Sequence, residues 1–143
     1  MKRLIQASAL VLLCTGCDRM AASADSKPLD LRGHWVGTSE SIVRGAPPHH
    51  ASQTGANPLL DNVRFDFNII GQDGRRFWGT VSSTKSDAEP LVGVIAYDGK
   101  TIVAEDTDGT LQGTIVDADT IDGVYSHTGT STVVAANRIK RQK

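Results

Sequence analysis

Short runs of alternating apolar and polar residues, separated by turn residues, repeat along the chain from residue 63 to its end. In the first run the apolar positions are Val63, Phe65, Phe67 and Ile69. This spacing is typical of a β-strand that buries one face. Gln72-Asp73-Gly74 follows the run, and Asp-Gly is typical of a tight hairpin turn. The pattern therefore predicts β-hairpins in sequence.

Similar runs continue to the end of the chain, and one precedes the first. They span 34–43, 75–83, 91–97, 101–105, 110–116, 121–127 and 132–139. Short connections make sequential strands pair in antiparallel fashion. We expect about eight strands to close into an up-and-down barrel, because closure removes exposed sheet edges. Glycines inside the runs (37, 79, 93, 113 and 123) permit the bends that a small barrel needs. A two-sheet sandwich is the alternative.

Residues 1–16 have the three parts of a secretory signal peptide. Lys2 and Arg3 supply positive charge, an apolar run follows from Ile5 to Cys14, and Thr15-Gly16 supplies small residues beside a cleavage site. The apolar run is shorter than the roughly 20 residues that a transmembrane helix requires, which favours a signal peptide over a membrane span. Because a secretory signal peptide directs export, we expect the protein to leave the cytoplasm.

The segment from Leu13 to Cys17 resembles the bacterial lipoprotein signal, although Cys14 stands where leucine is usual. The resemblance implies that Cys17 is lipidated, with palmitate among its acyl chains, and becomes the first residue of the mature protein. Asp18 resembles the inner-membrane retention signal of enteric lipoproteins. The expected location is the bacterial cell envelope, with the domain in the periplasm or on the surface. An ordinary signal peptide cut after Ala24 is the alternative.

Behind this signal we expect a lipidated tether at 17–30 and a single domain at 31–143. The residues of the tether are mostly small and polar and include a proline. The domain has no cysteine. The whole chain has 15 basic and 16 acidic residues, a balance that argues against nucleic-acid binding. A second irregular stretch runs from 45 to 62, and a loop of that length is usually functional or disordered.

Gly33-His34-Trp35 opens the first run, and Arg138 lies near the end of the last. This arrangement resembles the calycin superfamily, which includes lipocalins and avidins, over residues 33 to about 141. The resemblance implies that Trp35 plugs one end of the barrel and that Arg138 packs across it, with Arg141 as the alternative closing residue. Neither Trp35 nor the arginine is then catalytic. No second lipocalin motif is present, and the biotin-contacting residues of avidins have no counterpart here.

No segment carries a catalytic or cofactor motif, so we expect neither an enzyme nor a cofactor. Carboxylates and a histidine clustered within about 5 Å in a pocket would favour an enzyme instead. His49-His50 is the obvious metal candidate, but adjacent histidines rarely chelate one ion and no cysteine or acidic residue lies at ligand spacing. A metal site would need His34, His127 or a distant aspartate. We expect an exposed loop pair without a metal. The Asp106–Gly109 and Asp117–Asp119 segments lack the glutamate of a calcium loop. Outward, solvated carboxylates are expected at Glu40, Asp66 and Glu105.

Phe77 and Trp78 are adjacent, so we expect them on opposite faces of one strand. An exposed Trp78 is a candidate binding residue, together with His49 and His50. The run from Leu91 to Ala96 has no polar member, which predicts an outer face that is covered or that contacts a second copy in a homo-oligomer.

These features favour a membrane-anchored, non-enzymatic binding module. It would hold a small apolar ligand in the barrel mouth or a protein partner on its loops. The alternative is an inhibitor of an envelope or extracellular hydrolase, such as a protease or lysozyme. In that case the 45–62 loop, stiffened by Pro47-Pro48, would insert into the target.

Overall fold

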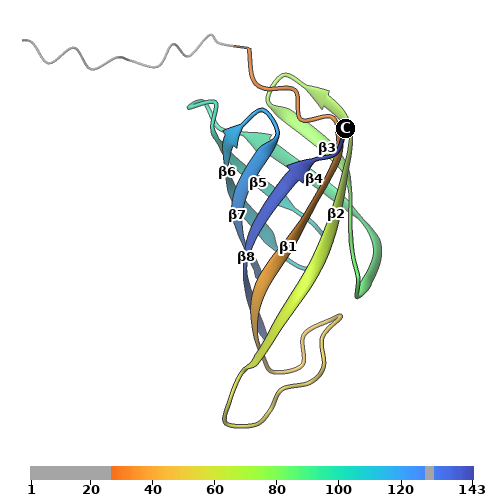
Figure 1. Ribbon diagram of the computed structural model, residues 1–143, viewed down its shortest axis with the longest axis vertical. Coiled ribbons are helices and arrows are strands. Elements are labelled where there is room, and N and C mark those ends of the chain that lie inside the picture. The colour runs from red at the N-terminus through yellow and green to blue at the C-terminus, as the bar shows by residue number, and fades with distance from the viewer. Residues whose placement is uncertain (1–26, 128–130) are drawn as a thin grey trace, which may run out of the picture.

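The computed structural model describes residues 27–127 and 131–143, which form eight β-strands and no helix. The strands are β1 (Gly33–Arg44), β2 (Leu59–Asp73), β3 (Arg76–Ser83), β4 (Ser86–Ile95), β5 (Thr101–Glu105), β6 (Thr110–Asp117), β7 (Thr120–His127) and β8 (Thr132–Arg141). Each strand pairs in antiparallel fashion with its sequence neighbour, and β8 pairs with β1 to close the barrel (Figure 1). The predicted meander barrel is confirmed, and the sandwich alternative is wrong.

The predictions for the N-terminus fall outside the described residues, apart from the end of the tether. The signal at 1–16, Cys17 and Asp18 are among them, and so is a turn expected near Gly129. Within the described ranges, no helix is long and apolar enough to cross a membrane. Leu29 packs against the core and its carbonyl accepts a hydrogen bond from Gln72. Contacts with the barrel therefore begin two residues before the predicted domain start at residue 31.

Two strands start earlier than the alternation predicts. β2 begins at Leu59, because Leu59 and Leu60 continue the ladder opposite Val43 and Ile42. The irregular loop consequently spans residues 45–58 rather than 45–62. β4 begins at Ser86 instead of Leu91. These extensions have mixed polarity, so backbone pairing continues there without the apolar alternation that marks the other strands.

The inward side chains fill the barrel from the end where β1 begins. Large apolar residues pack there with exposed fractions between 1% and 6%; they are Leu31, Trp35, Phe67, Ile69, Phe77, Leu91, Ile95, Ile102, Ile121 and Ile139. The spaces left among the inward side chains are about 20 and 10 Å³. At Gly93 an added Cβ would lie 2.3 Å from the Phe77 ring, so this strand glycine makes room for a core aromatic residue. The barrel interior is therefore a packed core.

Trp35 and Arg141 close this end of the barrel. The Arg141 guanidinium lies 4.2 Å from the centroid of the Trp35 ring and donates hydrogen bonds to the carbonyls of Arg32 (2.5 Å) and Asp30 (2.7 Å). The expected role of Arg138 is wrong. Side chains alternate across a strand, so residues 138 and 141 face opposite ways, and Arg138 points outward to Asp122. The alternative, Arg141, is the closing residue.

Candidate functional site at the open end of the barrel

Polar and titratable side chains converge at the end of the barrel opposite Trp35. This open end is formed by the loop at 45–58 and by the β3–β4 and β5–β6 turns, and in Figure 1 it lies at the bottom, away from the C-terminus. A cavity of about 60 Å³ opens between them. Its charged and polar lining residues include His49, His50, Lys85, Glu89, Asp106, Asp108, Tyr125 and His127. We take this open-end cavity as the candidate site.

The loop at 45–58 is held in place by its own hydrogen bonds. Gly45 and Gln53 form a two-way backbone bridge, with N···O distances of 2.8 and 2.6 Å. The Ala46 amide donates to the Ser131 hydroxyl at 2.8 Å. His49 has a φ of 63°, a left-handed conformation that is uncommon outside glycine. The loop therefore has a defined conformation, which places its histidines beside the barrel wall.

His49 lies between two carboxylates from distant parts of the sequence. Its Nε2 is 3.1 Å from Glu89 Oε1 on β4 and 3.1 Å from Asp108 Oδ2 in the β5–β6 turn. The Thr107 hydroxyl donates to the other oxygen of Glu89. Neither acidic residue is near His49 in sequence, which is why spacing alone did not reveal them. The fold brings one imidazole and two carboxylates together.

His50 is largely buried, with 12% of its side chain exposed. Its Nδ1 lies 3.4 Å from Asp61, and Asp61 also forms an ion pair with Lys85. Burial lowers the pKa of His50, and the nearby charge of Lys85 lowers this pKa further. His50 is therefore a neutral imidazole near pH 7. The expectation of an exposed histidine pair is wrong for His50, while His49 is 40% exposed.

Asp106 organises the β5–β6 turn beneath the cavity. Its Oδ1 accepts hydrogen bonds from the amides of Asp108 (2.9 Å) and Gly109 (2.7 Å) and from the Tyr125 hydroxyl (3.2 Å). Burial raises the pKa of Asp106, although these amides oppose the shift. Burial and the Asp106 charge also raise the pKa of Tyr125, so the phenol stays protonated. Asp106 thus fixes the turn and leaves the Asp108 carboxylate facing His49.

The other candidate residues do not join this cluster. Phe77 is buried and Trp78 is 43% exposed, which confirms that they lie on opposite faces of β3. Trp78 packs on Gly71, where an added Cβ would lie 2.2 Å from the indole. On β4, Val92 and Val94 are exposed, so an apolar outer face follows this strand. Of the three expected outward carboxylates, Glu40 and Glu105 are exposed, and Asp66 pairs with His34 at 3.0 Å.

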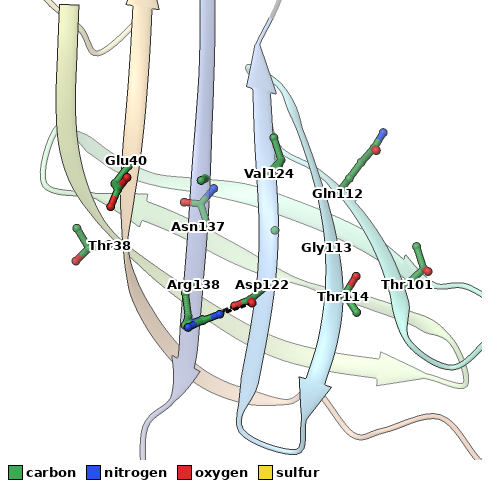
Figure 2. Close-up of a pocket in the computed structure, with 12 residues that line it drawn as sticks. Thr38, Glu40, Thr101, Gln112, Gly113, Thr114, Asp122, Val124, Asn137 and Arg138 are labelled. Carbon is green, nitrogen blue, oxygen red and sulfur yellow. Dashed lines mark hydrogen bonds and ion pairs between the residues drawn. The ribbon is translucent and has the colours of Figure 1, made fainter.

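A larger hollow of about 720 Å³ lies on the outer surface, across β5, β6, β7, β8 and β1 (Figure 2). Figure 2 shows Arg138 and Asp122 reaching toward each other from neighbouring strands, joined by two hydrogen bonds of 2.6 Å. The remaining lining is mostly small or neutral, including Thr38, Thr114 and Val124. Because its main charged groups neutralise each other, this outer groove is a weaker candidate than the open end.

The open-end cluster has a signal in the sequence that the apolar–polar alternation does not reveal. In a meander, every second connection lies at the same end of the barrel. The loop at 45–58, the turn at 84–85 and the turn at 106–109 are alternate connections. Polar residues in or beside these segments, such as Glu89 and Asp108, are therefore brought near the histidines by topology.

The eight-stranded meander is compatible with a calycin-like barrel. No family model matches the sequence, and searches of curated proteins and of solved structures find no significant match.

Proposed function

We propose that this chain is a lipid-anchored, non-enzymatic binding module of the bacterial envelope that engages a protein partner through the open end of its barrel. The observation that carries the proposal is the convergence of charged side chains from the barrel wall and turns beneath an ordered loop, above a filled interior. The deeper spaces measure about 20 and 10 Å³, whereas pockets for small ligands measure roughly 300–1,000 Å³. A partner on the loops is therefore better supported than an apolar ligand inside.

The loop at 45–58 has the properties of a recognition surface. Ala51, Ser52 and the residues from 54 to 58 are exposed, while the Gly45–Gln53 bridge restrains the backbone beneath them. A loop that is ordered before association loses less conformational entropy on binding. The cavity below it is lined by three carboxylates and one lysine, which favours a partner with basic groups at its contact surface.

The His49–Glu89–Asp108 cluster has groups that acid–base catalysis uses. The adjoining cavity of about 60 Å³ has room for a few waters, but it lies well below the roughly 300–1,000 Å³ of pockets for small ligands. A substrate would have to bind outside it, on the exposed loop surface. This size argues against an enclosed substrate pocket beside the cluster.

The anchoring part of the proposal rests on the segment from Leu13 to Cys17. Replacing Cys17 with serine is expected to abolish palmitate labelling and to move the protein from the membrane fraction to the soluble fraction. Cys14 is the only other cysteine, so Cys14→Ser is the matched control and should change neither result. A palmitate label that persists in Cys17→Ser would overturn the assignment.

Site-specific photo-crosslinking in the native envelope tests the binding proposal. A photoreactive residue is placed at Ala51 or Thr54 on the loop, and at Thr114 or Val124 in the outer groove as controls. All four positions are exposed. We expect a discrete crosslinked protein from the loop positions only. Crosslinks from the groove alone, or from none of the four positions, would refute binding through the open end.

Inhibition of an envelope or extracellular hydrolase is the second candidate. It is favoured by the exposed segment from 54 to 58, which projects beyond the Gly45–Gln53 bridge. Two carbonyls of this segment, those of Ala56 and Asn57, accept hydrogen bonds from the side chains of Arg44 and Gln53. A restrained, protruding loop is suited to insertion into a cleft. If the loop positions crosslink to the active-site cleft of a hydrolase, and the purified protein reduces the activity of that hydrolase, inhibition replaces the general binding module as the proposed function.

A further inference from the structure

We propose that His49, Glu89 and Asp108 form a zinc site that joins the loop at 45–58 to the barrel wall. Each residue offers one ligand atom, and the three atoms lie within 4.8 Å of one another. They come from three separate segments: the loop, β4 and the β5–β6 turn. A bound ion would therefore crosslink elements far apart in sequence, and it would do so with or without a protein partner.

The distances from His49 to the two carboxylate oxygens suit a tetrahedral zinc ion. His49 Nε2 is 3.1 Å from Glu89 Oε1 and 3.1 Å from Asp108 Oδ2. With zinc–ligand bonds of about 2.0–2.2 Å, neighbouring ligands of a tetrahedral ion lie about 3.3–3.6 Å apart. The two distances from His49 are thus within a few tenths of an ångström of those a zinc ion requires, and the two carboxylate oxygens lie within 4.8 Å of each other.

Charge also favours a cation at this position. Two carboxylates face one imidazole, and one N–H group can point directly at only one of the two oxygens. Lys85, the lysine lining the cavity, forms an ion pair with Asp61. A divalent ion between the three ligands would balance both carboxylates and accept the imidazole lone pair.

Neighbouring hydrogen bonds already orient the two carboxylates. Thr107 donates to Glu89 Oε2, which leaves Oε1 toward His49. Asp106 holds the amide of Asp108 at 2.9 Å, which positions the Asp108 side chain. Partners of this kind are usual around metal ligands and keep them aligned before the ion binds.

A separate observation concerns the other two histidines that line the cavity. The Nδ1 atom of His127 is buried and has no hydrogen-bond partner among the described residues, and the buried Nδ1 of His50 has only its 3.4 Å contact with Asp61. Buried polar atoms normally have such a partner. A zinc ion with three protein ligands keeps a fourth position for water or another donor, and a ligand in this cavity would bring a polar group to these imidazoles. The cavity thus has the polar lining that a hydrated metal site requires.

Zinc binding is measured on the full chain in detergent, purified without a histidine tag and stripped with a chelator. We expect one zinc per chain by calorimetry and a tetrahedral visible spectrum when cobalt replaces zinc. His49→Ala, Glu89→Gln and Asp108→Asn should each weaken zinc binding by at least about tenfold. The two near-isosteric variants keep the test valid if His49→Ala disturbs the loop, and circular dichroism checks each fold.

His34→Ala is the matched control, because His34 Nε2 also lies 3.0 Å from a carboxylate, Asp66, but on the outer surface. This variant should bind zinc with unchanged affinity. The proposal fails if the wild type binds no stoichiometric zinc. It also fails if binding is unchanged in all three ligand variants, which would indicate an adventitious surface ion. Because no partner enters this measurement, its outcome is independent of the photo-crosslinking test.

Discussion

Trp35→Ala is expected to lower the free energy of unfolding by about 3–5 kcal/mol, the usual cost of removing a buried tryptophan. The side chain is 1% exposed and belongs to the main core cluster. Its Nε1 donates a hydrogen bond to the carbonyl of the buried Leu31, at 2.8 Å. The substitution leaves a cavity, an unpaired carbonyl and an Arg141 guanidinium without its aromatic partner.

Trp78→Ala is the control for this prediction, because Trp78 is the only other tryptophan and is 43% exposed. Its cost should be about 1 kcal/mol or less, as for most surface positions. Urea unfolding followed by circular dichroism measures both variants. In Trp78→Ala the remaining fluorescence reports Trp35 alone, and its emission should be that of a buried indole. Equal losses in the two variants would contradict a core centred on Trp35.

The fold was predictable because alternation is a local property. Val63, Phe65, Phe67 and Ile69 predicted the inward face of β2, and three of these are buried in the structure while Phe65 packs against the core. Each short turn then restricts the next strand to antiparallel pairing, so a local pattern determines the topology. Where a strand continues past its alternating residues, as β2 does at Leu59, the backbone pairing depends on the partner strand. The sequence of the strand itself does not reveal it.

The open-end cluster could be predicted only in part. His49 and His50 were identified as the interesting pair, yet the positions of their side chains depend on the loop conformation. A φ of 63° at His49 and the bridge from Gly45 to Gln53 are not encoded by any short motif. Glu89 and Asp108 acquire their significance only when the meander brings alternate turns together.

The closing arginine shows why spacing must be combined with register. The resemblance to calycins predicts a closing arginine near the end of the last strand, and both Arg138 and Arg141 lie there. On β8, however, Asn137 and Ile139 are buried and Arg138 is exposed. Only a residue an even number of positions from them shares their face, and Arg141 satisfies this condition. Residue type alone left two candidates, and strand periodicity separates them.

Arg141→Ala is therefore expected to lower the free energy of unfolding by about 2–4 kcal/mol, from lost cation–π stacking and charged hydrogen bonds. The Arg141 side chain is 20% exposed, stacks on Trp35, and donates to the carbonyls of Arg32 and Asp30. Arg141→Lys should recover only part of this loss, because an ammonium group cannot reproduce the planar fork of donors.

Arg138→Ala is the matched control, three residues away on the same strand. Its guanidinium forms one exposed ion pair with Asp122, and exposed ion pairs contribute little to stability. Thermal and urea unfolding of the three variants should therefore place Arg138→Ala beside the wild type and Arg141→Ala well below it. If Arg138→Ala were the less stable variant, the exposed ion pair between Arg138 and Asp122 would contribute more to the stability of the barrel than the Arg141 guanidinium over Trp35 does.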